Sequence, residues 1–144
     1  MTGIEFFVHG SPATQGSKTG YVRGGRAIVV DLNPATLKPW REAIRQTALA
    51  AVPDGWLPLE GPVSVLIDFR LKRPASHPRR RTWPTGARSG DIDKLARACL
   101  DALTDAGIFG DDAQVTNLHA CKDYATDGRI GARITVATEG DPLL

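Results

Sequence analysis

The chain contains only two cysteines, Cys99 and Cys121, among 144 residues. Two cysteines are too few for the disulfide framework of a small secreted domain, so we expect two free thiols in a reducing compartment. No apolar stretch approaches the roughly 18 residues that span a bilayer. The first ten residues lack the basic start and small-residue cleavage site of a signal peptide. We therefore expect a protein of the cytosol with no membrane partner.

Several sequence motifs of other protein classes are also missing. The chain has no EF-hand loop, no Walker loop and no nucleophile elbow, which argues against calcium sensors, P-loop nucleotide hydrolases and serine hydrolases of that type. The composition itself is ordinary, with 42% hydrophobic and 24% charged residues. It suits one compact domain covering residues 1–144.

The positive charge is unevenly distributed along the chain. The 18 basic and 16 acidic side chains nearly cancel, which leaves a net charge of +2. Half of the basic residues nevertheless fall between positions 70 and 97, where Asp91 and Asp93 are the only acids. These basic residues are Arg70, Lys72, Arg73, Arg79, Arg80, Arg81, Arg88, Lys94 and Arg97. Such a concentration is typical of a surface that binds a polyanion.

Hydrophobic periodicity predicts the α/β (α+β) class, with a mixed β-sheet and two main helices in one small domain. The N-terminal third reads as strands, because residues 4–8 are apolar apart from Glu5, and residues 21–23 and 27–30 flank the hairpin signal Gly24-Gly25. Helical spacing follows from Trp40 to Ala51, with Pro39 in the first turn and Pro53 after the end. Residues 63–71 alternate as a strand with one buried face.

The second half of the chain begins with a long irregular loop. Residues 73–90 contain three prolines, two glycines and five arginines without periodicity, and loops of this length in small domains are usually functional or disordered. An apolar stripe then predicts a helix over residues 91–106, ended by Gly107. Two further strands are predicted at about 115–122 and 129–138. Alternation places His119 and Cys121 on one strand face, which we expect to pack in the core.

Three aspartates are candidates for a metal site. If the second helix starts near Asp93 and Asp91 is extended, both carboxylates converge at the helix N-terminus, and Asp111 or Asp112 can join them from the turn after Gly107. Clustered carboxylates repel one another unless one is protonated or a cation binds. Mg²⁺ suits such a set and bridges to phosphate oxygens. Together with the basic residues, the aspartates suggest a nuclease.

Each of these residues also has an ordinary structural interpretation. Asp91 and Asp93 can be a helix cap and a first-turn acid, and Asp111-Asp112 can be a plain turn. Arg97 can be one rung of an i,i+4 ion-pair ladder with Asp93, Asp101 and Asp105. The run from Arg79 to Arg81 can be solvated, and Trp83 can pack beneath the loop rather than stack on a base.

The segment from Asp91 to Leu103, followed by Ala106-Gly107 and residues 111–115, resembles the core of the RusA-type Holliday junction resolvases, including phage-borne members. The stretch from Pro12 to Lys18 also resembles their early loop. The resemblance implies Mg²⁺-dependent cleavage, with Mn²⁺ as a substitute, of four-way junction DNA by a homodimer. It assigns Asp91, Asp93 and Asp112 as metal ligands. The essential lysine of the family's best-known member falls on Arg97, and an asparagine falls on Lys94.

The departure at Arg97 matters because arginine stays protonated and cannot act as a general base. Arg97 and Lys94 therefore remain the two candidates for the catalytic cation. We expect a homodimer on physical grounds too, because a junction with near two-fold symmetry needs two opposed nicks. The residues predicted to bind DNA are Lys18, Lys72, Arg73, Arg79, Arg80, Arg81 and Arg88.

Two other function classes stay open at this point. One is a different Mg²⁺-dependent nuclease that acts on flaps, forks or RNA. The other is a DNA-binding module without catalysis, in which the aspartates only start a helix. For a junction resolvase or for this other nuclease, the expected location is the cytosol, at the nucleoid or in a phage-infected cell.

Overall fold

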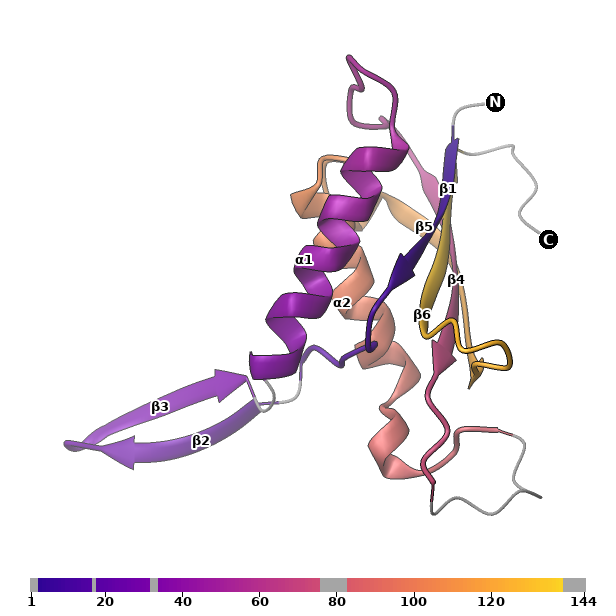
Figure 1. Cartoon of the computed structure of the whole chain (residues 1–144). Helices are drawn as coiled ribbons and strands as arrows, with labels where there is room; N and C mark the ends of the chain where they lie inside the picture. The colour runs from indigo at the N-terminus through magenta and orange to yellow at the C-terminus, as the bar shows by residue number, and fades with distance from the viewer. Residues whose placement is uncertain (1–2, 17, 32–33, 76–82, 139–144) are drawn as a thin grey trace.

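A computed structural model describes residues 3–16, 18–31, 34–75 and 83–138 of the chain. Figure 1 shows a mixed sheet with two helices on one side and a separate hairpin that projects from the body. The strands are β1 (Gly3–His9), β2 (Lys18–Arg23), β3 (Arg26–Asp31), β4 (Val63–Leu71), β5 (Val115–Tyr124) and β6 (Gly131–Thr138). The helices are α1 (Pro34–Ala51) and α2 (Ile92–Asp105). This architecture confirms the predicted α+β class.

The main sheet has four strands in the order β1-β6-β4-β5. β4 pairs in parallel with β5, while β1 with β6 and β4 with β6 pair antiparallel. A parallel pair requires a crossover connection, which here contains the irregular loop and α2. The crossover therefore carries most of the predicted site residues across one face of the sheet.

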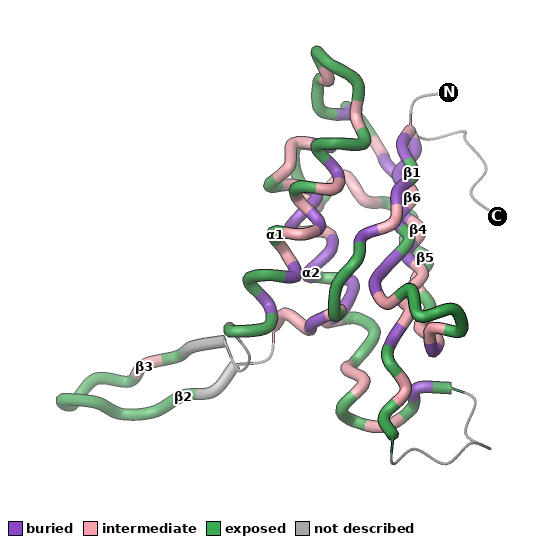
Figure 2. Tube along the Cα trace, viewed as in Figure 1, coloured by how far each residue is buried: buried purple, intermediate pink, exposed green. Residues whose placement is uncertain are grey.

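The hydrophobic core lies between the helices and the sheet, as the buried segments in Figure 2 show. Along β4, alternate side chains are fully buried and their neighbours are partly exposed, as the strand's sequence pattern predicts. α1 contributes Trp40, Ile44 and Ala48 to this core, and α2 contributes Leu95 and Cys99. None of the helices in the described ranges is long and apolar enough to cross a membrane.

The start of α1 differs from the sequence prediction. The helix begins at Pro34, so Pro39 lies inside it rather than at its start. A proline at the first helical position is favourable because its missing N–H would lack a partner there in any case. Pro34 takes that position, and Leu37, only 3% exposed, extends the buried face of α1 by one turn before Trp40.

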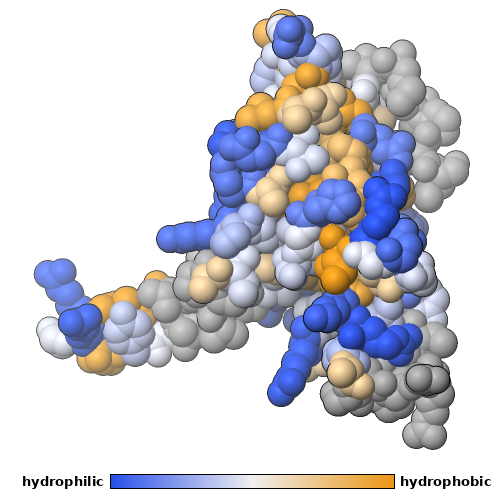
Figure 3. All heavy atoms as spheres, in the orientation of Figure 1, coloured by the Kyte–Doolittle hydropathy of each residue, from blue (hydrophilic) through white to orange (hydrophobic). Residues whose placement is uncertain are grey.

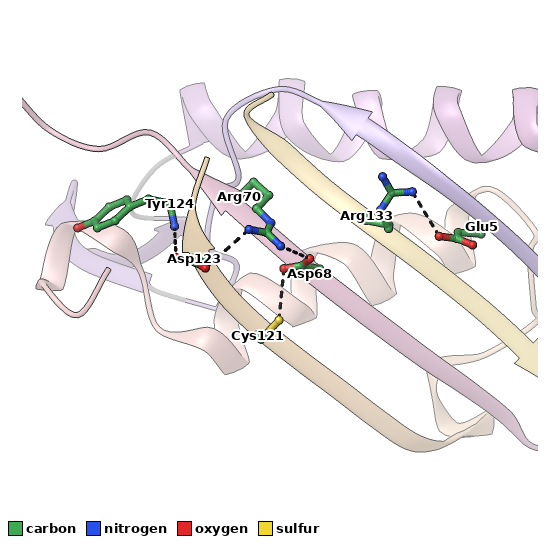
Figure 4. A network of polar contacts seen from close by, with 7 residues as sticks. All are labelled: Glu5, Asp68, Arg70, Cys121, Asp123, Tyr124 and Arg133. Carbon is green, nitrogen blue, oxygen red and sulfur yellow. Dashed lines mark hydrogen bonds and ion pairs between the residues drawn. The ribbon is translucent and has the colours of Figure 1, made fainter. Parts of the chain in front are cut away.

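The prediction that His119 and Cys121 lie in the core is wrong. Both side chains are exposed, because they project from β5 on the sheet face that the helices do not cover. On the same face, shown in Figure 4, Arg70 forms ion pairs with Asp68 at 2.8 Å and Asp123 at 3.7 Å. Its guanidinium is therefore neutralised by two carboxylates.

The two cysteines have different surroundings. Cys99 is buried in the core, and burial raises the pKa of its thiol. Cys121 donates a hydrogen bond to Asp68 at 3.3 Å. Partial desolvation is the larger cause and the nearby Asp68 carboxylate the smaller one, and together they raise the pKa of the Cys121 thiol to about 11. Both are free thiols, as the sequence predicts, and both resist ionisation at neutral pH.

Candidate active site

The N-terminal end of α2 presents two carboxylates that the helix does not use. Asp91 occupies the N-cap position with an extended backbone, yet its side chain accepts no capping hydrogen bond. Its carboxylate is 69% exposed and lies 3.6 Å from the Lys94 ammonium. Asp93 follows in the first turn and is also exposed. The capping interpretation of Asp91 therefore explains its position but not its side chain.

Contacts from two other segments, β5 and the loop before β2, fix this end of α2. Lys122 of β5 donates hydrogen bonds to Ser89 Oγ at 2.8 Å and to the Gly90 carbonyl at 2.6 Å. Gly90 has φ +89°, and a Cβ there would lie 2.7 Å from Thr14 Cγ2, so only glycine fits before Asp91. The backbone N–H of Gln15 donates a hydrogen bond to the Lys94 carbonyl at 3.0 Å.

Asp112 lies beyond the other end of α2, in contact with Thr104. The Thr104 hydroxyl donates a hydrogen bond to the Asp112 carboxylate, and the Gln15 side-chain amide donates to Asp101. Partial burial raises the pKa of Asp112, and a hydrogen bond shared with Asp101 raises it further. Asp101, Thr104, Asp111 and Asp112 line one side of an open hollow of about 360 Å³.

The three predicted metal ligands thus fall into two groups within one chain. Thr104 lies eleven positions after Asp93 on the same helix, so the rise of the helix separates them by about 16 Å. Two oxygens bound to one Mg²⁺ lie within about 4 Å of each other. The described residues form no group of three His, Cys, Asp or Glu side chains fit to hold a metal. Within one chain, the structure therefore places Asp112 apart from Asp91 and Asp93.

Arg97 does not belong to an ion-pair ladder on α2. Asp101 accepts a hydrogen bond from Gln15, and Asp105 pairs with Arg41 of α1 at 2.5 Å. The Arg97 guanidinium instead lies against Gly16, where a Cβ would come within 3.1 Å of Nη1. Of the two candidate cations, only Lys94 is paired with one of the predicted metal ligands.

Three of the residues predicted to bind DNA, Lys72, Arg73 and Arg88, have described side chains. Lys72 and Arg88 are exposed, whereas Arg73 is partly buried with its guanidinium 4.4 Å from the centre of the Tyr124 ring. Arg79, Arg80 and Arg81 lie outside the described residues, as does the side chain of Lys18. Trp83 is 57% exposed, so it does not pack beneath the loop.

Sequence reasoning missed four residues that organise the site. They are Gln15, Asp101, Thr104 and Lys122. Apart from the bond between Thr104 and Asp112, their contacts join segments distant in the chain. Only the resemblance of the stretch from Pro12 to Lys18 to a family loop drew attention to Gln15. Nothing in the alternation of β5 distinguishes Lys122 from any solvated lysine.

The fold and this helix end define a small α+β protein with acidic and basic groups suited to phosphodiester chemistry. The model of the RusA endodeoxyribonuclease family matches residues 10–135, which is most of the chain. The chain therefore belongs to the RusA endodeoxyribonuclease family. It is a DNA-hydrolysing enzyme of a family that acts on Holliday junctions, and resolvase nucleases of this kind generally use a divalent metal. No curated protein sequence matches the chain.

Proposed function

We propose that the protein is a Mg²⁺-dependent homodimer that resolves four-way DNA junctions by paired symmetric nicks. The observation that carries this proposal is the pair Asp91 and Asp93 with Lys94, at a helix end that uses neither carboxylate as a cap. Mg²⁺ typically binds one or two protein carboxylates and keeps several waters for substrate phosphates. The pair at the start of α2 suits that preference.

Side chains near the start of α2 could bind DNA and supply positive charge beside the two carboxylates. The Lys94 ammonium and the N-terminus of α2 both attract a phosphate. Arg88 lies in the short 3-10 turn Ala87–Ser89 just before the helix, where an arginine can contact the DNA backbone. The exposed Trp83 ring offers a stacking surface for an unpaired base near the crossover. A bound divalent ion would supply an activated water and neutralise charge on the scissile phosphate.

The separation of Asp93 from Asp112 suggests how two subunits would be arranged in the dimer. Because the helix holds Asp93 and Asp112 apart within one chain, we assign Asp112 to the site of the partner subunit. A two-fold axis across α2 brings the start of one helix toward the end of the other, which makes two equivalent composite sites. Two sites are what two opposed nicks in a junction require.

The proposal is tested with a labelled four-way junction on a denaturing gel. We expect symmetric nicks near the crossover with Mg²⁺ or Mn²⁺ and none with EDTA, and no cleavage of a matched linear duplex. Equal cleavage of flaps, forks and junctions would point to a broader structure-specific nuclease. Sedimentation of the free protein should give twice the chain mass. A DNA substrate of this kind implies work in the cytosol, at the nucleoid or in a phage-infected cell.

A further inference from the structure

The β2–β3 hairpin, called here the arm, forms a two-stranded sheet of its own. Figure 1 shows it projecting from the body beside the start of α1. Tyr21 is 47% exposed, Val22 76% and Val29 68%, and Figure 2 shows exposed residues along most of the described length of the arm. An isolated two-stranded hairpin is marginally stable in water. An arm with these exposed apolar side chains therefore needs a partner surface.

The register of the arm separates its side chains into two faces. Directly paired residues project to the same side, so the pairs Arg23–Arg26 and Tyr21–Ile28 share one face. The pair Val22–Ala27 lies on the other face. Figure 3 shows strongly hydrophilic and hydrophobic side chains together on the arm. One face is thus basic and aromatic, and the other is aliphatic.

The charge of the arm indicates the chemistry of its partner. Arg23 and Arg26 are directly opposite each other across the turn, and like charges in that position repel. No acidic residue lies between positions 20 and 29 to compensate them. A polyanion between the two guanidinium groups removes the repulsion, and DNA is the polyanion on which this enzyme family acts.

The shape of the arm suits a DNA groove. Gly24 and Gly25 have φ +58° and +76°, the backbone of a tight two-residue turn, and they leave the tip without side chains. The major groove is about 12 Å wide and admits a two-stranded ribbon. Strand β2 has six residues, which extend about 20 Å, or roughly six base pairs of duplex.

The arm is rooted next to the candidate active site. Gln15, three residues before β2, is bonded to the Lys94 carbonyl, and Gly16 lies against Arg97. We propose that the arm is a DNA-binding element that enters the major groove of a duplex arm flanking the cut, through Arg23, Arg26 and Tyr21. This inference rests on the proposed function only in that the substrate contains duplex DNA.

Junction binding in EDTA at several salt concentrations tests the arm without cleavage. The double variant Arg23→Ala/Arg26→Ala should weaken binding tenfold or more at about 0.1 M salt and reduce the slope of log K against log salt by about 1.8, because each phosphate contact contributes about 0.9. The matched control Arg129→Ala/Arg133→Ala removes the same charge from the uncovered sheet face and should change the slope much less. An unchanged slope, or equal losses in both variants, overturns the proposal.

Photo-crosslinking identifies the occupant directly. In a Cys121→Ser background, Ile28→Cys carries an aryl azide on the basic face of the arm, and Leu49→Cys carries it on α1 as a control. We expect crosslinks from position 28 to labelled junction DNA and none from position 49. Crosslinks from position 28 to a second protein chain, or to nothing, contradict the proposal. Wild-type cleavage in Mg²⁺ is scored separately, so failure of the proposed function shows there and not in these EDTA measurements.

Discussion

Asp91 and Asp111 each occupy the N-cap position of a helical segment, but their side chains make different contacts. Asp111 caps the short turn Asp112–Gln114, accepting from the Ala113 amide at 2.8 Å, and Gln114 completes the capping box. Asp91 makes no such bond. Asp91→Asn and Asp93→Asn should each reduce single-turnover cleavage at least 100-fold, because each removes a charged candidate metal ligand. The melting temperature should change little, because the Asp91 side chain makes no capping bond and the Asp93 side chain is exposed. Asp111→Asn is the control and should keep most activity; full activity in Asp91→Asn would remove Asp91 from the site.

The contacts of Lys94 and Arg97 distinguish the two candidates for the catalytic cation. Lys94 faces Asp91, whereas Arg97 lies against the backbone of the loop at Gly16. Lys94→Ala should lower the single-turnover rate on the order of 10²-fold with little loss of binding, because positive charge fixed near the phosphate acts mainly on the transition state. Arg97→Ala should lower the rate less, and Arg97→Lys should retain it. The reverse order of effects would identify Arg97 as the catalytic cation.

Asp112 has a predictable effect on stability in the absence of metal. Burial and the bond with Asp101 raise the pKa of this carboxyl in the folded state. An acid with a raised pKa costs stability above its unfolded pKa of about 3.9, and the cost disappears below that pH. Asp112→Asn should therefore raise the melting temperature at pH 7 in EDTA, with the gain shrinking as the pH falls toward 3. Asp54→Asn, which removes an exposed carboxylate, should show no such pH dependence; a lower melting temperature for Asp112→Asn would refute the argument.

At the scale of elements, Lys122 couples strand β5 to the start of α2. Its ammonium holds Ser89 and Gly90, the two residues before Asp91. Lys122→Met keeps the apolar stem and removes the donor, so we expect about a tenfold loss in the cleavage rate at saturating DNA with the fold retained. Lys38→Met, at an exposed position of α1, should have no effect. A loss confined to binding would make Lys122 a DNA contact instead.

The elements also show how far the sequence predicts the structure. Local patterns predict β4, α2 and the hairpin correctly, because alternation, helical spacing and the Gly24-Gly25 turn depend on neighbouring residues. They fail for His119 and Cys121, since alternation cannot tell which sheet face the helices cover. They also do not reveal that Asp93 and Asp112 lie apart within one chain, because that separation depends on the length of α2 and on the contact of Asp112 with Thr104.

At the scale of the whole molecule, mixed dimers test the composite site. Homodimers of Asp93→Asn and of Asp112→Asn should both be inactive. A heterodimer of the two variants has one intact site, so it should nick one strand of the junction without resolving it. The heterodimer of Asp91→Asn with Asp93→Asn, in which both sites are defective, is the matched control. A first heterodimer as inactive as its parents would show that the carboxylates act within one chain.

The anchoring of the crossover at both ends has an evolutionary consequence. Leu71 at the end of β4 accepts a hydrogen bond from the Ala125 amide at 2.8 Å, and Gly90 is held by Lys122. Both anchors are on or next to β5, so the length of chain between them can vary without moving the sheet or α2. Loop-closure entropy rises slowly, and doubling a loop costs only about 0.6 kcal/mol. Insertions and deletions between these two anchors can therefore accumulate in a lineage while β4, β5 and α2 keep their places.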